Sequence, residues 1–294
     1  MKTADALALA RSADPEVESI LSVSQIATLW GGMGSIVRIR CETKKSSTTT
    51  TMIAKKIRCS NPRSFGDKRK AVSYKVEASF YGSDACRELS EQHICCRGLH
   101  TDDNGKGSIT ILMEPLPNPS LYSMEGEVAK AAVRSVAKLH AYFSGQKSQT
   151  AVEEIGLAEQ GTYWYLDTRP DEYDAMDGRR GLSAKLKKAA VGIDRALKEH
   201  QYQTICHGDL KACNMSMSKD PSYVTFVDFQ YLGRACPAKD LAYLFVCGMD
   251  IDYDFEERQE EELLSLYIEE LEANGVGGNT EDPLPTMDEL KSAL

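Results

Sequence analysis

The sequence lacks the long apolar run that would place the chain in a membrane. Its apolar stretches, such as LAYLFVCGM (241–249), are far shorter than the roughly 20 residues that a bilayer-spanning helix needs. No charged-then-apolar signal pattern follows Met1. We therefore expect no membrane span and a cytoplasmic location.

Positive charge is also scarce. The chain has 35 Lys and Arg residues against 44 Asp and Glu residues, which gives a formal net charge of -9. This balance argues against nucleic acid as a general partner. A small or a cationic partner fits the composition better.

A disulfide framework is missing as well. The nine cysteines are odd in number and scattered over the chain, so we expect reduced thiols. The segment HICCRGLH offers His93, Cys95, Cys96 and His100, but their spacing matches no standard zinc pattern and no second ligand pair follows. We predict no metal site there.

The hydrophobic periodicity predicts an α+β protein. Helical spacing covers 1–21, with Pro15 where a helix would start or break, and again 67–88. Alternating apolar residues predict strands at 24–30, 35–42, 51–57 and from 108 onward. The C-terminal part reads as helical, at 127–143, at 182–200 and up to Gly275. Strands first and helices afterwards predict a small sheet lobe and a larger helical lobe.

One short motif carries chemistry. HGDLKACN (207–214) places Asp209 and Asn214 five positions apart in a loop between two strand-like segments, and Asp228 lies at the end of the second of these. Asp209 could orient an acceptor hydroxyl, while Asn214 and Asp228 offer the hard oxygen ligands that Mg²⁺ prefers. Turn-forming residues would be the simpler interpretation, but the rest of the chain favours phosphoryl transfer.

A cation and its partner precede this motif. Lys55 lies on the third predicted strand, and Glu77 on the helix that follows could hold its ammonium in place. Lys56 is the rival, but on a strand it points to the opposite face from Lys55. The turn GGMGS (31–35) could let backbone amides approach phosphate oxygens.

These residues resemble those of the aminoglycoside phosphotransferase and choline kinase-like superfamily, and most closely the ecdysteroid kinase-like (CHK kinase-like) small-molecule kinases. The resemblance covers about 30–245 and rests on HGDLKACN with the following VDFQ, and on VEASFY, ILMEPL, VAKLHAYF and PAKDLAYLF. It implies a bilobal protein-kinase-like fold: a small antiparallel-sheet N-lobe with one main helix, and a larger, mostly helical C-lobe.

The resemblance also implies roles for single residues. Asp209 corresponds to the catalytic aspartate, Asn214 and Asp228 to the metal ligands, and Lys55 and Glu77 to the ion pair. The backbone of Glu114 and Leu116 would meet the adenine ring of ATP. His207 would pack under the catalytic loop, and Asp240 would brace that loop from the start of a helix.

The glycine turn departs from the kinase pattern. Counted from Gly32, the last glycine of G-x-G-x-x-G is replaced by Val37. Gly32, Gly34 and Ser35 are then left to contact phosphate. We expect a nucleotide-binding lobe at 1–116, a catalytic and acceptor-binding lobe at 117–275, and a loosely ordered tail at 276–294 that is rich in Gly, Pro and acids.

The resulting hypothesis is an ATP- and Mg²⁺-dependent kinase that phosphorylates a hydroxyl of a small molecule. A protein kinase is the first alternative, but only twelve positions separate Asp228 from Asp240 and no A-P-E motif follows. The second alternative is a non-catalytic nucleotide-binding or scaffold protein of the same fold.

The acceptor itself could be cationic. Acids at 171–177 and 250–262 lie near Tyr163, Trp164 and Tyr231 in the sequence and could surround a positive charge through charge and cation–π attraction. The simpler interpretation of these aromatic residues is packing, and of the acids a solvated face.

Overall fold

The structure is a computed structural model that describes residues 1–294 except 45–48, 60–61, 63, 250–256 and 279–282. The chain forms two compact units. The first consists of Met1–Pro119 and Thr225–Gln230, and the second of Ser120–Val224 and Tyr231–Leu294. Each unit is described separately below.

The first unit is built on an antiparallel sheet of five strands in the order β1-β2-β3-β5-β4. The strands are β1 (Val17–Thr28), β2 (Gly34–Thr43), β3 (Thr49–Arg58), β4 (Gly98–Asp103) and β5 (Ser108–Met113). The helices are α1 (Thr3–Ala13), α2 (Phe65–Tyr81) and α3 (Asp84–Glu91), and a 3₁₀ turn, η1 (Trp30–Gly32), joins β1 to β2.

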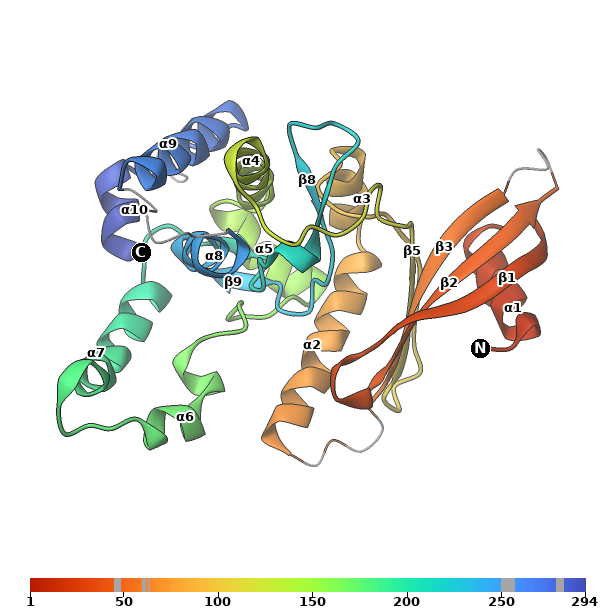
Figure 1. Ribbon diagram of the computed structural model, residues 1–294, viewed down its shortest axis with the longest axis horizontal. Coiled ribbons are helices and arrows are strands. Elements are labelled where there is room, and N and C mark those ends of the chain that lie inside the picture. Colours follow the sequence, from red (N-terminus) through yellow and green to blue (C-terminus); the bar gives the residue numbers. More distant parts are fainter. Residues whose placement is uncertain (45–48, 60–61, 63, 250–256, 279–282) are drawn as a thin grey trace. The chain divides into compact units, whose positions relative to one another are not determined.

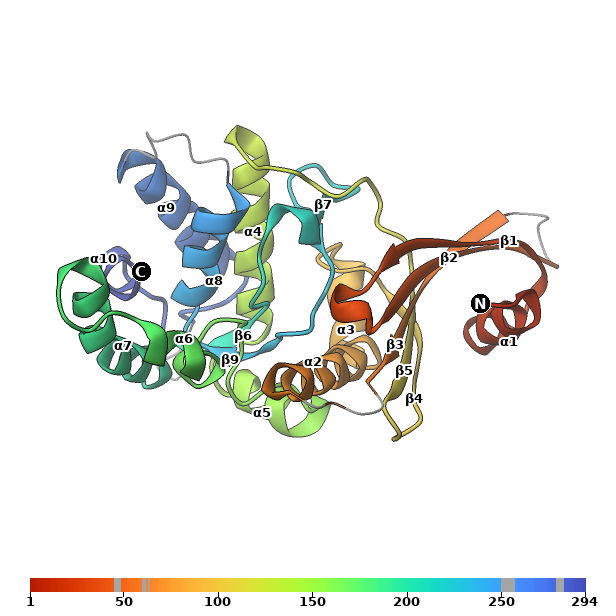
Figure 2. The ribbon, with the colours of Figure 1, turned by 60° about the horizontal axis from the view of Figure 1, so that its bottom comes forward.

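The two faces of this sheet are covered by different helices. Figures 1 and 2 show α1 on one side of the sheet and α2 with α3 on the other. Ala54 of β3 belongs to the same buried apolar cluster as Ala6 and Ala10 of α1. Because side chains alternate along a strand, the next residue, Lys55, points to the face that α2 covers.

The N-terminal segment corrects the sequence-based expectation of helical structure over 1–21. Helix α1 ends at Ala13, and β1 begins at Val17, just after Pro15. Residues from Val17 to Ser22 pair with β2, where Ile20 faces Cys41. Cross-strand pairing thus overrides the helical spacing of their apolar residues. The helix expected at 67–88 is likewise two helices, α2 and α3, which separate at Gly82.

The second unit is mainly helical. Its helices are α4 (Gly126–Tyr142), α5 (Gln146–Ile155), α6 (Pro170–Ala175), α7 (Gly181–Lys198), α8 (Ala238–Tyr243), α9 (Glu257–Ala273) and α10 (Met287–Ala293). Short turns are η2 (Leu166–Thr168), η3 (Ala212–Asn214) and η4 (Leu244–Gly248), and short strands are β6 (Thr204–Cys206), β7 (Met215–Met217) and β9 (Gly233–Ala235). Strand β8 (Val224–Phe226) starts in this unit and continues into the first.

Helices α4 and α9 pack side by side in the core of this unit (Figures 1 and 2). His140 of α4 and Tyr267 of α9 are both buried, and a hydrogen bond of 2.8 Å joins the His140 Nδ1 atom to the Tyr267 hydroxyl. Strand β6 pairs with β9 in antiparallel register. The motif 207–214 therefore begins directly after a strand that is paired with β9.

The expectation of loose order at 276–294 is corrected in part by α10. Thr286 and Glu289 form a capping box at the start of this helix, and Leu290 is fully buried. The hydroxyl of Tyr202 also donates to Glu289 Oε2 at 2.8 Å. Within the part of the chain that the structure describes, we find no helix that is long and apolar enough to cross a membrane.

Candidate active site

Lys55, Glu77 and Asp228 form a charged cluster in the first unit. The ammonium of Lys55 on β3 donates to both carboxylate oxygens of Glu77 on α2, at 2.9 and 2.7 Å, and to Asp228 Oδ1 at 2.8 Å. Lys55 and Glu77 are buried, whereas the Asp228 side chain is 30% exposed. The three N–H donors of the ammonium are thereby all in use.

The backbone around Asp228 is unusual. Its φ of 69° lies in the left-handed region, which few non-glycine residues adopt. Gln230 donates to Asp228 Oδ1 at 2.5 Å, and the Ser73 hydroxyl of α2 contacts Gln230 at 3.3 Å. These side chains fix the orientation of the Asp228 carboxylate relative to α2.

Burial governs the electrostatics of the cluster. Complete burial raises the pKa of Glu77 to about 7, although the Lys55 ammonium and a hydrogen bond from the Phe229 backbone act to lower it. Burial acts to lower the pKa of Lys55, but the two carboxylates outweigh it and raise that pKa above its ordinary value. Lys55 is therefore a firmly charged, fixed cation.

The glycine turn uses part of its backbone internally. The Gly32 amide donates to the Leu29 carbonyl at 3.0 Å, and the Leu29 amide donates to the Gly34 carbonyl at 2.9 Å. Ser35 pairs across the sheet with Thr28 on one side and with Lys56 on the other. The turn is thus closed by its own hydrogen bonds.

Position 34 requires a glycine for a structural reason that does not involve phosphate. Its φ of 153° is unfavourable for residues with a side chain, and a Cβ atom there would collide with the backbone carbonyl of Lys56. Gly34 therefore allows β2 to approach β3 closely, independently of any phosphate.

The segment expected to meet adenine follows β5 directly. The Glu114 amide donates to the Arg97 carbonyl at 2.9 Å. Its own carbonyl is therefore the backbone group of Glu114 that a nucleotide could use. Leu116 is half-buried two residues further on.

Asp209 and Asn214 lie together in the loop 207–214 of the second unit. Both are buried, and the Asn214 amide nitrogen donates to the Asp209 backbone oxygen at 2.9 Å and to Asp209 Oδ2 at 3.1 Å. Lys211 donates to the same Oδ2 atom at 2.8 Å. The orientation of the Asn214 amide turns its oxygen, the potential metal ligand, away from Asp209.

Asp240 holds the start of this loop from α8. Its carboxylate accepts the backbone amides of His207 at 2.7 Å and Gly208 at 2.8 Å. His207 is fully buried, and its Nδ1 atom lies 3.3 Å from the Asp209 amide. The backbone on both sides of Gly208 is therefore fixed by side chains.

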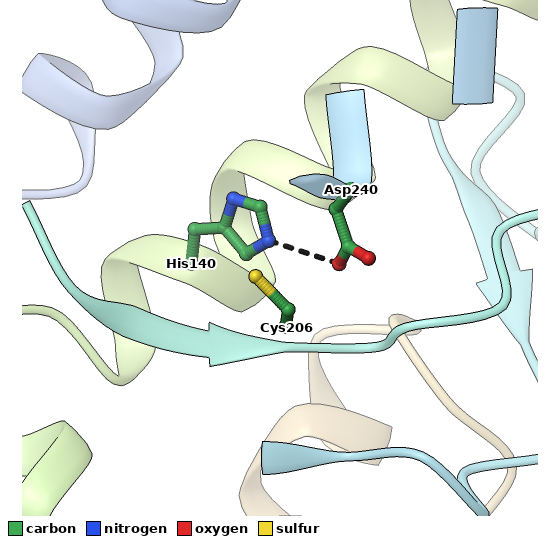
Figure 3. Close-up of side chains that lie close together, drawn as sticks. All are labelled: His140, Cys206 and Asp240. Atoms are coloured by element: carbon green, nitrogen blue, oxygen red, sulfur yellow. Dashed lines mark hydrogen bonds and ion pairs between the residues drawn. The ribbon is translucent and has the colours of Figure 1, made fainter. Parts of the chain in front are cut away.

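Figure 3 shows two further side chains beside Asp240, His140 and Cys206. His140 of α4 points its Nε2 atom at Asp240 Oδ2, at 3.1 Å, and Cys206 of β6 lies beside the pair. Burial acts to raise the pKa of Asp240, but the hydrogen bond and charge of His140 hold it below its ordinary value. The group is a buried hydrogen-bond network behind the loop.

This trio has ligand atoms within 4.8 Å of one another, which is the proximity a metal site requires. Each atom, however, already has a protein partner: Tyr267 binds the other nitrogen of His140, two amides bind Asp240, and the thiol of Cys206 contacts the Cys236 carbonyl at 3.5 Å. We interpret the trio as support for the loop and not as a metal centre.

Sequence reasoning missed two side chains at Asp209. Lys211 lies within the motif itself, and Tyr243 of α8 donates its hydroxyl to Asp209 Oδ1 at 2.9 Å. A signal for Tyr243 exists: it follows Asp240 by three positions, so both lie on one face of α8. The contact to Asp209, 34 residues away, has no local signature in the sequence.

Two aromatic residues near the loop, Tyr163 and Trp164, already contact a cationic side chain of the protein, Arg169. The Arg169 guanidinium lies 4.2 Å from the Tyr163 ring centroid and 4.0 Å from that of Trp164. Tyr231 packs against Tyr163 with ring centroids 4.8 Å apart. The acidic residues 250–256 lie outside the described residues, so the structure describes only part of the expected acidic surroundings.

An antiparallel sheet unit with a buried lysine–glutamate pair, and a helical unit with a braced Asp–Asn loop, define a kinase-like phosphotransferase fold. The chain matches the phosphotransferase enzyme family over residues 69–276, more than two thirds of its length. It belongs to this family. The predicted superfamily and the α+β fold class are thus confirmed, whereas assignment to the ecdysteroid kinase-like branch stays a prediction.

Known relatives resemble the chain to different extents. A macrolide 2′-phosphotransferase from Brachybacterium faecium is 11% identical with a TM-score of 0.53, and the alignment covers 99% of this chain and 86% of that one. An aminoglycoside phosphotransferase from Streptomyces rimosus, solved with ADP and streptomycin, is 17% identical with a TM-score of 0.50, covering 100% and 96%. At these identities the likeness concerns the fold alone.

A sequence relative matches a shorter segment. The probable ethanolamine kinase B of Dictyostelium discoideum is 32% identical over 75 residues, which are 24% of this chain. The match spans only 17% of that relative's length.

Proposed function

We propose that the protein is a kinase that uses ATP and Mg²⁺ to transfer the γ-phosphoryl group to a hydroxyl of a small-molecule acceptor. The observation that carries this proposal is the buried catalytic loop, in which Asp209 and Asn214 contact each other at 3.1 Å and Asp240 fixes the preceding backbone. Membership of the phosphotransferase family supports it.

Asp209 is the residue that receives the acceptor hydroxyl. A fixed carboxylate can accept the hydroxyl hydrogen bond and so aim an oxygen lone pair at phosphorus, which is most of what the protein contributes to phosphoryl transfer. Asn214, Lys211 and Tyr243 supply the hydrogen bonds that fix it. Asp209 is 5% exposed, so little water competes for its oxygens.

Lys55 is the cation that holds the nucleotide phosphates. All three of its donors are in use, so binding a phosphate requires that one contact is given up. Asp228 is the more exposed partner, whereas Glu77 is buried and contacts the ammonium with both oxygens. We expect Lys55 to exchange Asp228 for phosphate and to keep Glu77.

The exchange would remove the ammonium from Asp228 Oδ1, to which Gln230 also donates, and the Asp228 carboxylate could then serve as a metal ligand. With the side-chain oxygen of Asn214, it gives two hard oxygen donors of the type that suits Mg²⁺. The Asn214 amide fits this role, because its nitrogen faces Asp209 and its oxygen faces away. Mg²⁺, when bound, supplies charge neutralisation on the phosphate oxygens.

The remaining nucleotide contacts follow the predicted assignment. The Glu114 carbonyl and the backbone of Leu116 are the groups for adenine, and Gly32, Gly34 and Ser35 lie on the turn assigned to the phosphates. Since the Gly32 amide already donates to Leu29, its contribution would require the turn to open.

The acceptor is a small alcohol. The described residues do not decide between a positively charged and a neutral one. One similar structure contains streptomycin, and one relative is a probable ethanolamine kinase. Both support an acceptor that carries an amine. Arg169 argues against a positively charged acceptor at the aromatic residues, because its guanidinium already lies on the rings of Tyr163 and Trp164. A comparison of charged with neutral alcohols therefore decides the acceptor class.

The test is acceptor-dependent consumption of ATP with Mg²⁺. The acceptors tested are choline, ethanolamine, aminoglycosides, sugars and sterols. Choline is compared with its uncharged carbon isostere, which tests whether the positive charge is recognised. The matched control is Asp209→Asn, which keeps the size of the side chain and removes the charge. We expect turnover with at least one compound and none with the variant.

Turnover that survives in Asp209→Asn would refute the assigned role of this residue. Binding of ATP without turnover of any acceptor would favour the non-catalytic alternative. Equal turnover of choline and its uncharged isostere would exclude recognition of a cation.

A further inference from the structure

Tyr243 contacts the catalytic aspartate in a way that the proposed function does not yet use. Its hydroxyl donates to Asp209 Oδ1 at 2.9 Å. The side chain is half-buried, at the end of α8, and the helix continues from it into the π-helical turn Leu244–Gly248. Asp209 is thus held by a side chain that reaches it from α8.

The two oxygens of Asp209 differ in how many donors they already have. Oδ2 accepts from Lys211 at 2.8 Å and from Asn214 at 3.1 Å. Among the described residues Oδ1 accepts one side-chain donor, the Tyr243 hydroxyl. A carboxylate oxygen offers about two lone-pair sites, so Oδ2 is saturated and Oδ1 can accept one more hydrogen bond.

Helix α8 holds Asp209 at two levels. Asp240, on the first turn, binds the backbone amides of His207 and Gly208, and Tyr243 follows three residues later on the same face. One short helix therefore fixes both the backbone before Asp209 and the rotation of its side chain.

The hydroxyl is suited to permanent donation. Burial and the neighbouring Asp209 carboxylate raise the pKa of Tyr243 well above its ordinary value. Tyr243 therefore stays protonated and points its hydrogen at Oδ1 throughout the neutral range.

We propose that Tyr243 is a positioning residue that sets the rotation of the Asp209 carboxylate, so that Oδ1 is the oxygen that accepts the hydrogen bond of the acceptor hydroxyl. This inference rests on the proposed function of Asp209. The acceptor hydroxyl then lies next to the phenol oxygen of Tyr243, with both donating to the same atom.

The test is the substitution Tyr243→Phe, which removes one oxygen atom and keeps the ring. Tyr202→Phe is the matched control, because the Tyr202 hydroxyl also donates to a carboxylate in the same unit, Glu289 Oε2, at 2.8 Å. The measurements use Mg²⁺, ATP and ethanolamine, or whichever alcohol of the panel is turned over fastest. They give kcat, the KM for ATP, the thermal midpoint, and the ratio of transfer to the alcohol over transfer to water.

We expect Tyr243→Phe to lower kcat about ten-fold, the loss of one hydrogen bond to a charged group. The KM for ATP should stay unchanged, and transfer to water should gain relative to transfer to the alcohol, because the acceptor is no longer aligned. Tyr202→Phe should change neither kcat nor this ratio.

Two results would overturn the inference. One is a Tyr243→Phe enzyme with the kcat and transfer ratio of Tyr202→Phe, and the other is a loss of activity accompanied by an equal loss of ATP affinity and thermal stability. Asp209→Asn, measured alongside, separates the two hypotheses: if it remains active, the proposed function itself fails, and if it is inactive, only the role of Tyr243 is in question.

Discussion

Removal of the Lys55 ammonium separates the structural from the chemical role of the charged cluster. In Lys55→Met, Glu77 loses the cation that it contacts at 2.7 and 2.9 Å while it stays 1% exposed. Breaking a buried ion pair by removing one partner costs about 3–5 kcal/mol, because the other group must either keep its charge in the interior or take up a proton there. We therefore expect a large loss of stability in the single variant, and with it the loss of kinase activity.

The double variant Lys55→Met with Glu77→Leu removes both charges and fills the space with apolar atoms. Replacement of a whole buried pair in this way is often close to neutral for folding. We expect its urea midpoint, measured by circular dichroism, to return most of the way to that of the unmodified protein. Its turnover of ATP with an acceptor should nevertheless stay absent, since no ammonium remains to hold the phosphates.

Lys56→Met is the matched control, because Lys56 is the neighbouring lysine on β3, lies on the opposite face and is only half-buried. It should change neither stability nor turnover appreciably. A single variant Lys55→Met that unfolds at the same urea concentration as the unmodified protein would refute the energetic argument. An active double variant would refute the assignment of Lys55 to the phosphates.

Three further predictions follow from the same geometry. The folded-state pKa of Glu77, about 7, lies above its ordinary value. The stability that protonated Glu77 contributes is therefore fully present below about pH 4.5 and is lost as the pH rises through 7. The urea midpoint should fall over this pH range, and Glu77→Gln should remove that part of the fall. Gly34→Ala should destabilise by more than about 2 kcal/mol, because a Cβ meets the Lys56 carbonyl at a strained φ, and an unchanged melting temperature relative to Ser35→Ala would contradict this. Asn214→Ala should raise the Mg²⁺ concentration for half-maximal activity by about ten-fold, whereas a lower kcat with an unchanged Mg²⁺ requirement would show that Asn214 acts only through its hydrogen bonds to Asp209.

The fold class could be predicted because its signals are local. Alternation of apolar residues marks β2 and β3, and good helix formers with a regular apolar face mark α4. Pro15 marks a break in the helical spacing, but the start of β1 at Val17 could not be predicted, because the pairing of Ile20 with Cys41 depends on a partner strand 21 residues away. Strand β4 was missed for a similar reason, since GLHTDD has little strand propensity and forms only against β5.

The candidate site shows the same division between local and distant signals. The motif 207–214 contains Asp209, Lys211 and Asn214, which are bound to one another within a single loop, so short-range spacing is informative there. From other elements, Tyr243 reaches Asp209 in this loop, and Arg169 reaches the ring of Trp164. Such contacts depend on where α8 and the segment before α6 pack, and spacing along the chain does not encode that.

The shape of the loop 207–214 explains why a glycine precedes Asp209, the proposed catalytic aspartate. Gly208 has a φ of 83°, and a Cβ at this position would lie 2.5 Å from the Thr162 Cα and 2.8 Å from the Tyr231 carbonyl oxygen. The backbone is thus pressed between two other segments while Asp240 binds its amide. A side chain at 208 would have to break one of these contacts, and any shift would be passed directly to the next residue, Asp209. The position of the carboxylate is therefore set by the packing of the loop's backbone, and its rotation by the donors on its two oxygens.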